Sequence, residues 1–338
     1  MTFTVTNQRN QSEFDVAPGE TILEGALRNN LIFPYGCRNG ACGACKCKLI
    51  DGSVDYGQFE SYALTEEEIS SGQMLICQAT PKENVVIDVE QIMAGQSIRI
   101  KTMPCRVAKL ERVASDVMVL NLQLPNTQTF DYIPGQYLDI IMKDGQRRSF
   151  SIANLPEQSK QEGLELHVRL VQDGEFTPRV FESMRERDLL KFEGPFGTYF
   201  MQSEPGTPII MIAGGTGFAP IKALIEQTLA ANPDFSIHLF WGARDQQDLY
   251  LNDLPENWQS EYSNFSYTPV LSESKDDSWQ GENGWVHEAV IRQYPDFTNY
   301  HVYASGPPVM IDAIRTEFGK RNLSTDRFFF DSFEYANS

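Results

Sequence analysis

Basic residues are scarce in this chain: 28 Lys and Arg stand against 46 Asp and Glu, and the formal net charge is −18 at pH 7. Nucleic acids and anionic membrane surfaces repel such a charge, so neither is an expected partner. Residues 1–97 are the most densely acidic part, with 6 basic and 13 acidic side chains. A solvated, solubilising surface explains this excess, and so does an acidic face that steers docking onto a basic protein partner.

Long apolar runs are also missing. The most apolar window, 208–225, contains three glycines, Pro220 and Lys222, so it indicates a buried strand, a tight turn and a helix rather than a membrane span. The first residues, MTFTV, alternate like a strand and lack the basic and apolar regions of a secretory signal. We therefore expect a cytoplasmic protein, long enough for about two or three domains.

Histidine occurs only four times, as His167, His238, His287 and His301. None lies near a cysteine in the spacing of a Rieske centre, and no pair of histidines with a carboxylate suits mononuclear iron. The chain itself is therefore not expected to be an oxygenase.

Four of the six cysteines follow the spacing Cys37-x4-Cys42-x2-Cys45, with Cys77 after 31 intervening residues. Plant-type [2Fe-2S] clusters have this spacing. Two irons and two sulfides need four thiolates around one small rhomb, so a looped segment supplies three and a distant residue supplies the fourth. The sequence predicts Cys37, Cys42, Cys45 and Cys77 as the metal ligands.

Disulfides and zinc are the alternatives for these cysteines. A reducing compartment disfavours disulfides, and structural zinc sites usually pair two Cys-x2-Cys segments, whereas only one is present. Gly36, Gly40 and Gly43 lie between the ligands, where glycine permits unusual backbone dihedrals and brings amides toward the sulfur atoms. Cys47 and Cys105 are left over, and Cys47 is expected to be a small buried residue rather than a fifth ligand.

The surroundings of the cysteines resemble plant-type ferredoxins over residues 1 to about 95. Segments 3–8 and 13–16 are predicted to form a hairpin, Thr21 to cap a helix, and 85–89 to form a later strand. The resemblance implies a β-grasp ferredoxin domain.

Short strand-like segments follow at 105–110, 117–122, 137–142 and 164–171, and they predict an antiparallel β-barrel. Among them lies Arg147-Arg-Ser-Phe-Ser-Ile152, which is a weak signal alone. Between a ferredoxin-like part and a dinucleotide-like part, it resembles the Arg-x-Tyr-Ser flavin motif of the ferredoxin–NADP reductase superfamily. The resemblance implies bound FAD, with Arg148 pairing with a flavin phosphate, Phe150 packing on the isoalloxazine and Ser151 near flavin N5.

Two further stretches fit the same superfamily. His167, Val168 and Arg169 occupy the strand that borders the ribityl chain and phosphates, and Gly174 and Thr177 match a glycine-led turn that binds the pyrophosphate. For His167, an exposed position on an alternating strand is an equally good interpretation.

From position 205 strands and helices alternate, which predicts a Rossmann-like parallel sheet. A strand at 208–212 leads through a glycine-rich turn into a helix, and the next strand begins at 237. The turn departs from G-x-G-x-x-G, but the reductase superfamily uses Gly-Gly-Thr-Gly-x-Ala-Pro. The resemblance implies that the nicotinamide dinucleotide binds to Gly214, Gly215, Thr216, Gly217 and Pro220.

The remaining nicotinamide motifs match further downstream, at Gly306 and Pro307. Ser305 holds the position where the superfamily usually has cysteine beside nicotinamide C4. Phe333 matches a C-terminal aromatic residue that covers the flavin. By resemblance, Ser151, Ser305 and Phe333 are therefore the candidate catalytic residues.

The choice between NADH and NADPH depends on Arg244, which follows the second strand. NADH is favoured because Arg244 is a single cation there, and Asp245 and Asp248 would repel a 2′-phosphate. The alternative is that Arg244 binds that phosphate.

Almost the whole chain resembles the single-component reductases of bacterial Rieske aromatic-ring dioxygenases, nearest to the benzoate and toluate 1,2-dioxygenase type. The resemblance implies a multidomain protein of α+β and α/β class: a [2Fe-2S] ferredoxin domain at 1–97, an FAD-binding β-barrel at 98–203 and an NAD-binding domain at 204–338. It implies that NADH gives a hydride to flavin N5 and that single electrons then pass through the cluster to the Rieske centre of a terminal oxygenase. Two alternatives stay open, the reductase of a di-iron monooxygenase and a non-enzymatic redox sensor that binds NADH without turnover.

Overall fold

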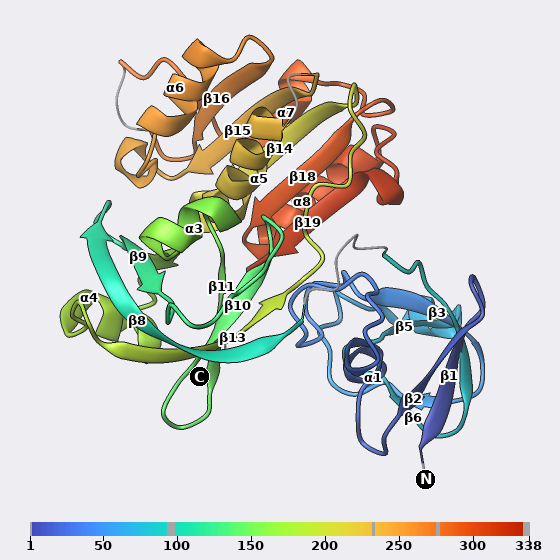
Figure 1. Cartoon of the computed structure of the whole chain (residues 1–338). Coiled ribbons are helices and arrows are strands. Elements are labelled where there is room, and N and C mark those ends of the chain that lie inside the picture. Colours follow the sequence, from blue (N-terminus) through green and yellow to red (C-terminus); the bar gives the residue numbers. More distant parts are fainter. Residues whose placement is uncertain (1, 93–98, 232–233, 275–277, 334–338) are drawn as a thin grey trace. The chain divides into compact units, whose positions relative to one another are not determined.

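The computed structural model describes residues 2–92, 99–231, 234–274 and 278–333, which fold into two compact units, 1–98 and 99–338 (Figure 1). The expected boundary at 97/98 lies outside the described residues. Within the described ranges, no helix has the length and apolarity needed to cross a membrane.

The first unit is a β-grasp, a mixed five-stranded sheet of order β2-β1-β7-β3-β5 on which helix α1 packs. Strands β1 and β7 are parallel, and the other neighbours are antiparallel. The elements are β1 Phe3–Asn7, β2 Ser12–Val16, α1 Ile22–Arg28, β3 Lys46–Asp51, β4 Val54–Asp55, α2 Glu66–Ser70, β5 Gln73–Leu75, β6 Thr80–Pro81 and β7 Val85–Asp88.

Helix α1 begins at a capping box. The Oγ1 of Thr21 accepts a hydrogen bond from the Glu24 amide at 3.2 Å, and the Glu24 carboxylate accepts one from the Thr21 amide at 2.9 Å. Gly25 faces β2, where an added Cβ would lie 2.6 Å from Cγ2 of Val16, so glycine permits this close packing. The hairpin and the helix cap predicted from the sequence are both confirmed.

The second unit opens with a six-stranded antiparallel barrel of order β11-β10-β13-β8-β9-β12. A bridge between Ile152 and Leu166 joins its outer strands, and Leu120, Leu138 and Phe192 are fully buried in its core. The elements are β8 Lys101–Arg112, β9 Val117–Gln123, β10 Tyr137–Ile141, β11 Arg147–Ser151, α3 Pro156–Glu162, β12 Leu164–Arg169, α4 Phe176–Glu182 and β13 Leu189–Phe196.

A six-stranded parallel sheet of order β17-β16-β15-β14-β18-β19 completes the second unit. This is the Rossmann-like part. Its elements are β14 Pro208–Gly214, α5 Phe218–Ala231, β15 Ser236–Ala243, α6 Asp253–Glu261, β16 Phe265–Leu271, β17 Glu282–Asn283, α7 Val286–Gln293, β18 His301–Gly306, α8 Pro308–Gly319 and β19 Phe328–Ser332, with 3-10 turns at 215–217, 246–248 and 325–327.

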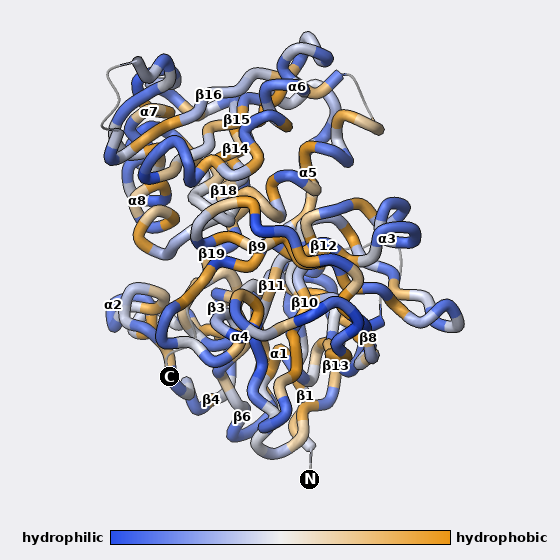
Figure 2. The backbone as a smooth tube through the Cα atoms, turned by 90° about the vertical axis from the view of Figure 1, so that its left-hand side faces the viewer, coloured by the Kyte–Doolittle hydropathy of each residue, from blue (hydrophilic) through white to orange (hydrophobic). Residues whose placement is uncertain are grey.

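Alternate residues of β14 enter two separate cores. Ile209, Met211 and Ala213 pack under α5 and α6, whereas Ile210 and Ile212 pack under α7 and α8 (Figure 1). In Figure 2, β14 is accordingly coloured as a hydrophobic strand. A strand that is covered by helices on both faces has a continuous run of apolar residues, and for this reason β14 could be predicted from the sequence. The predicted fold class is confirmed.

Candidate functional site

The four predicted cluster ligands lie in two pairs in the first unit. The side chains of Cys37 and Cys42 are hydrogen-bonded to each other, and so are those of Cys45 and Cys77. The Cys42 amide also donates to Cys37 Sγ at 3.3 Å. The hydrogen bond from the Cys42 thiol, with backbone amides beside it, lowers the pKa of Cys37 to about 6 against the effect of burial. The same hydrogen bond, together with burial, raises the pKa of Cys42, so Cys37 is the sulfur of this pair that more readily becomes a thiolate.

Glycine is needed in the loop that carries three of these ligands. Gly40 and Gly43 have φ of +84° and +75°, and a Cβ on Gly40 would lie 2.5 Å from the Gln58 carbonyl oxygen. A Cβ on Gly36 would lie 3.2 Å from Cys42 Sγ. The backbone thus closes tightly around the sulfur atoms, as the sequence predicts.

This arrangement fits a two-iron cluster better than a single ion. In the part of the chain that the structure describes, no three His, Cys, Asp or Glu side chains are placed to hold one metal ion. A [2Fe-2S] rhomb instead takes two thiolates on each iron, which matches the two cysteine pairs. Cys47 and Cys105 are buried in β3 and β8, where burial raises the pKa of each to about 12.

Strand β11 carries the predicted flavin residues on the barrel. Arg148 is half-buried, and its guanidinium donates to the Gln146 side chain at 2.7 Å. The Phe150 ring lies 5.4 Å from that of Phe176, centroid to centroid, and part of it stays exposed for a ligand. Ser151 is buried, and its hydroxyl donates to Oδ2 of Asp331 at 3.1 Å.

The turn after β12 is fixed by its own side chain. Thr177 Oγ1 accepts a hydrogen bond from the Val171 amide at 2.9 Å and donates to the Val171 carbonyl at 3.1 Å. Gly174 lies in the same turn, where its amide donates to that carbonyl at 3.0 Å. The Thr177 hydroxyl therefore closes the turn rather than pointing at a ligand, and backbone amides are left for phosphate oxygens.

His167 differs from both sequence interpretations. It is 5% exposed, so the exposed position is wrong. Its Nε2 lies 2.9 Å from Glu165 Oε1 and its Nδ1 lies 2.9 Å from the Tyr250 hydroxyl. Both ring nitrogens are engaged with protein groups, so the imidazole has no donor or acceptor left for the flavin. Val168 beside it is a barrel-core side chain with no exposed surface.

A pocket of about 510 Å³ lies at the carboxyl ends of the parallel strands. Its lining brings together the glycine turn 214–216, segment 242–244, segment 284–288 and Pro307, which are far apart in the sequence. Ligands of open α/β sheets bind at this edge. The dinucleotide motifs are thus gathered where a dinucleotide would bind.

Close backbone contacts explain the glycines of this pocket. A Cβ on Gly217 would lie 2.0 Å from the Ser305 carbonyl oxygen, and one on Gly214 would lie 2.7 Å from Met310 Sδ. Ser305 is fully buried, and its hydroxyl has no hydrogen-bond partner among the described residues. A buried polar atom without a partner is uncommon, and a polar group of a bound ligand would satisfy it. Pro220 follows in the buried first turn of α5.

Arg169 and Arg244 meet at the barrel side of the pocket. Both lie close to Oδ2 of Asp116, at 3.0 and 3.2 Å, and Arg244 Nε also lies 2.7 Å from Asp248. The sequence motifs include both arginines, but they give no sign of Asp116, because it lies in a turn of the barrel.

Phe333 lies beside this site. The Phe333 amide donates to the Gly306 carbonyl at 3.0 Å. Two residues earlier in the chain, Asp331 accepts the hydrogen bond from Ser151. Asp331 was missed in the sequence, where an acidic residue in an aromatic-rich tail carries no signal. The three candidate catalytic residues therefore belong to one region formed by β11, β18 and the end of β19.

A ferredoxin fold with two cysteine pairs, a flavin-type barrel and a dinucleotide pocket together define a flavin- and nicotinamide-dependent iron–sulfur oxidoreductase. Three family models agree: the 2Fe-2S iron-sulfur cluster binding domain over residues 5–82, the oxidoreductase FAD-binding domain over 104–201 and the oxidoreductase NAD-binding domain over 211–316.

Known reductases resemble the chain over nearly its whole length. It is 40% identical over 313 residues to the CDP-6-deoxy-L-threo-D-glycero-4-hexulose-3-dehydrase reductase of Yersinia pseudotuberculosis, with 93% of each chain covered. It is 32% identical over 320 residues to reductase component 2 of the terephthalate 1,2-dioxygenase of Comamonas sp, covering 95% of this chain and 94% of the relative. The crystal structure of the Amycolatopsis cytochrome P450 reductase GcoB has a TM-score of 0.82 at 29% identity, covering 99% of this chain and all of the other.

The chain therefore belongs to the ferredoxin–NADP reductase superfamily, as an NAD-, FAD- and [2Fe-2S]-binding reductase with an N-terminal ferredoxin domain. The predicted reductase class and its cofactors are confirmed. The benzoate or toluate type stays a prediction.

Proposed function

We propose that this protein is an NADH-dependent reductase that delivers single electrons through its [2Fe-2S] cluster to a separate terminal enzyme. The observation that carries the proposal is the hydrogen bond between Ser151 and Asp331, because it places the flavin strand of the barrel against the nicotinamide sheet beside Ser305. When bound, NADH would supply a hydride to the flavin, and the flavin would pass electrons one at a time to the cluster.

Each part of the site has its own task in this proposal. Arg148 and the amides of residues 175–177 hold the flavin phosphates, and Phe150 covers the isoalloxazine. The turn at 214–217 receives the dinucleotide pyrophosphate at the start of α5. Ser151 orients the reacting face of the flavin, Ser305 gives its unpartnered hydroxyl to the nicotinamide, and Phe333 covers the flavin until the nicotinamide displaces it. Cys37, Cys42, Cys45 and Cys77 hold the irons.

The proposed dinucleotide is NADH rather than NADPH. Arg244 is the cation at the end of β15, and it is paired with Asp116 and Asp248. A 2′-phosphate would have to displace these carboxylates, whereas a ribose hydroxyl can accept or donate beside them.

The terminal enzyme has three candidates of different chemistry. A Rieske aromatic-ring oxygenase is the acceptor expected from the sequence, and the 32% identity to a terephthalate dioxygenase reductase supports it. A sugar-nucleotide dehydrase is the second, favoured by the 40% identity to the Yersinia dehydrase reductase. The hydroxylase of a di-iron monooxygenase is the third candidate, since its reductase belongs to the same oxygenase-reductase class.

Reconstitution tests the proposal. The purified reductase, NADH and one acceptor at a time are combined: the oxygenase component of a terephthalate dioxygenase, a CDP-hexulose dehydrase, or the hydroxylase of a di-iron monooxygenase. Product formed with only one acceptor assigns the partner class. Before that, anaerobic NADH should bleach the absorption of both the flavin and the cluster; unchanged spectra would leave the redox sensor as the better interpretation.

A further inference from the structure

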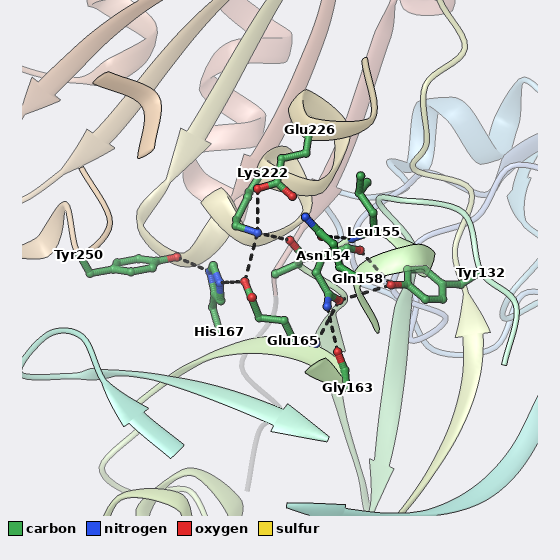
Figure 3. Close-up of polar contacts among 11 residues, drawn as sticks. Tyr132, Asn154, Leu155, Gln158, Gly163, Glu165, His167, Lys222, Glu226 and Tyr250 are labelled. Atoms are coloured by element: carbon green, nitrogen blue, oxygen red, sulfur yellow. Dashed lines mark hydrogen bonds and ion pairs between the residues drawn. The ribbon is translucent and has the colours of Figure 1, made fainter. Parts of the chain in front are cut away.

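A buried charged cluster joins the barrel to helix α5 of the nicotinamide part (Figure 3). At its centre is Lys222, which is 6% exposed. Its Nζ donates to the Ala153 carbonyl at 3.0 Å and lies 3.3 Å from Glu165 Oε1, both in the barrel. It also lies 3.0 Å from Oε1 of Glu226, one turn further along α5. These four residues are called the Lys222 cluster below.

The carboxylate of Glu165 is kept ionised inside this cluster. Burial by itself would raise its pKa, but the hydrogen bond with His167 and the nearby ammonium of Lys222 outweigh that effect and lower the pKa to about 2. Because a carboxylate only accepts, His167 Nε2 is the donor to Glu165, and Nδ1 accepts from the Tyr250 hydroxyl. Tyr250 belongs to the nicotinamide part, so His167 makes a second link between the two parts.

The barrel side of the cluster is held firmly in place. The Tyr132 hydroxyl donates to the Asn154 carbonyl at 2.9 Å, and the Asn154 side chain bonds the Gly163 carbonyl at 2.9 Å and the Glu165 amide at 3.1 Å (Figure 3). These bonds hold the backbone next to Ala153, whose carbonyl accepts the hydrogen bond from Lys222.

The position of the cluster in the chain connects the two cofactor sites. Helix α5 begins at Phe218, directly after the dinucleotide turn, and Lys222 follows in its second turn. Ala153 follows shortly after Ser151, which ends the flavin strand. One ammonium group thus ties the element that receives the dinucleotide phosphates to the strand that carries the flavin.

Stability alone does not explain why lysine is buried here. Apolar residues of similar volume often hold two parts together as well as a buried ion pair does, because ions lose their hydration on burial. Hydrogen bonds to an ammonium are directional, whereas apolar contacts permit sliding. Hydride transfer requires a closely fixed distance between donor and acceptor, since a displacement of about 1 Å can cost about 100-fold in rate.

We propose that Lys222 is a positioning residue for hydride transfer, which sets the distance between the dinucleotide turn and the flavin strand through its bonds to Ala153 and Glu165. The inference rests on the proposed transfer of a hydride from NADH to the flavin. Lys222 touches neither cofactor in this role, and it acts through the geometry of α5.

The test uses the holoenzyme and the double variant Lys222→Met/Glu226→Gln, which removes one charge of each sign and so leaves the formal charge of the cluster unchanged. The matched control is Lys320→Met/Glu317→Gln, which makes the same exchange in a partly exposed ion pair at the C-terminal end of α8, where Glu317 also pairs with Arg321. Stopped-flow absorbance at increasing NADH separates the limiting rate of flavin reduction from the dissociation constant of NADH.

We expect the limiting rate of the double variant to fall at least about tenfold, with the dissociation constant of NADH unchanged within about threefold and a larger isotope effect with deuterated NADH. The control variant should match the wild type. An unchanged limiting rate, or a fall that is matched by equal weakening of NADH binding, overturns the proposal. If the double variant does not bind FAD, Glu165→Gln keeps the side-chain shape and weakens the same link, and an unchanged limiting rate in that variant overturns it equally.

A measurement without turnover separates this inference from the proposed function. In hydrogen–deuterium exchange of the oxidised full chain, segments 152–158 and 218–229 should exchange faster in the double variant, with β1 to β7 unchanged. Equal exchange in variant and wild type overturns the positioning role. Failure of NADH to reduce the wild-type flavin would instead contradict the proposed function. In that case the exchange measurement by itself still tests whether Lys222 holds α5 against the barrel.

Discussion

The hydroxyl of Ser151 donates a hydrogen bond to Asp331 over 3.1 Å, although the two residues are 180 positions apart. Ser151 ends β11 of the barrel and Asp331 lies in β19, at the edge of the parallel sheet. The bond gives the serine hydroxyl a single orientation in a buried place, because a carboxylate only accepts. A hydroxyl held this way is suited to orienting a flavin or to moving a proton at its edge.

Removing that hydroxyl should slow flavin reduction without emptying the flavin site. In Ser151→Ala the FAD content should stay near one per chain, because Arg148 and Phe150 remain. The rate of flavin reduction by NADH should fall about tenfold or more, as for loss of a positioned proton-transfer group. Stopped-flow absorbance of the flavin band is the measurement.

Asp331→Asn is the matched variant for this test, since it keeps an acceptor for the Ser151 hydroxyl and loses only the charge. Its rate should lie between those of Ser151→Ala and the wild type. A Ser151→Ala protein with the wild-type rate would remove Ser151 from the proposed catalytic residues.

Cys77→Ser should separate the two half-reactions. Cys77 pairs with Cys45, so its loss leaves one iron with a single thiolate and the cluster should not assemble. NADH-dependent reduction of ferricyanide by the flavin should persist, while reduction of cytochrome c should be lost. Iron and sulfide analysis gives the cluster content, and Cys47→Ala is the control because Cys47 is a buried cysteine of β3 outside the two pairs. Equal loss of both activities would contradict the proposed order of electron transfer.

The parts of the fold that the sequence predicted well are those with local signals. The strand at β14, the glycine turn after it and the cysteine spacing each depend on neighbouring residues. Gly217 illustrates the reason, because its contact with the Ser305 carbonyl leaves no room for a side chain. A glycine in the sequence therefore indicates a close contact even when the contacting residue is unknown.

The residues that the sequence did not reveal depend on partners far along the chain. Lys222 reads as an ordinary helix lysine, and Asp116 as a turn residue, until folding brings Ala153 to one and Arg244 to the other. For His167, the alternating pattern of β12 left two interpretations equally good, a contact with the flavin and an exposed position. Its burial followed only from the packing of Tyr250 against it. No short-range pattern carries this information.

The pairing of Arg244 predicts how the dinucleotide preference can be changed. Arg244 lies 2.7 Å from Asp248 and 3.2 Å from Asp116, so its charge is already partnered at the mouth of the pocket. In Asp248→Asn the guanidinium loses one carboxylate, and a 2′-phosphate meets less repulsion. We expect kcat/KM for NADPH to rise about fivefold relative to NADH, as for about 1 kcal/mol at a half-exposed ion pair.

Steady-state kinetics with both dinucleotides measure this ratio. Asp253→Asn, which removes one acidic charge from α6, is the control for a general change in net charge. Asp116→Asn should shift the ratio in the same direction as Asp248→Asn. If neither variant changes it, Arg244 does not govern the choice of dinucleotide.

His238 should make the nicotinamide part less stable in mild acid. Its imidazole is hydrogen-bonded to Tyr294 and Thr268 at 2.8 Å each, and burial lowers its pKa from 6.5 to about 4. Between these two values the unfolded chain takes up a proton that the folded chain refuses. The free energy of unfolding therefore falls as the pH falls from about 6.5 to about 4, by about 3 kcal/mol.

Comparison with a His238→Gln variant isolates this contribution, because other buried groups such as His167 titrate alike in both proteins. All four tryptophans lie between positions 241 and 285, so their fluorescence in urea reports unfolding of this part of the chain. The variant should be less stable than the wild type at pH 7.5, since an amide fits the Tyr294 and Thr268 hydroxyls less well. The difference should shrink or reverse by pH 4.5, where the wild-type histidine must be kept neutral at a cost. Parallel stability curves for the two proteins over this range would mean that His238 keeps an ordinary pKa in the folded chain.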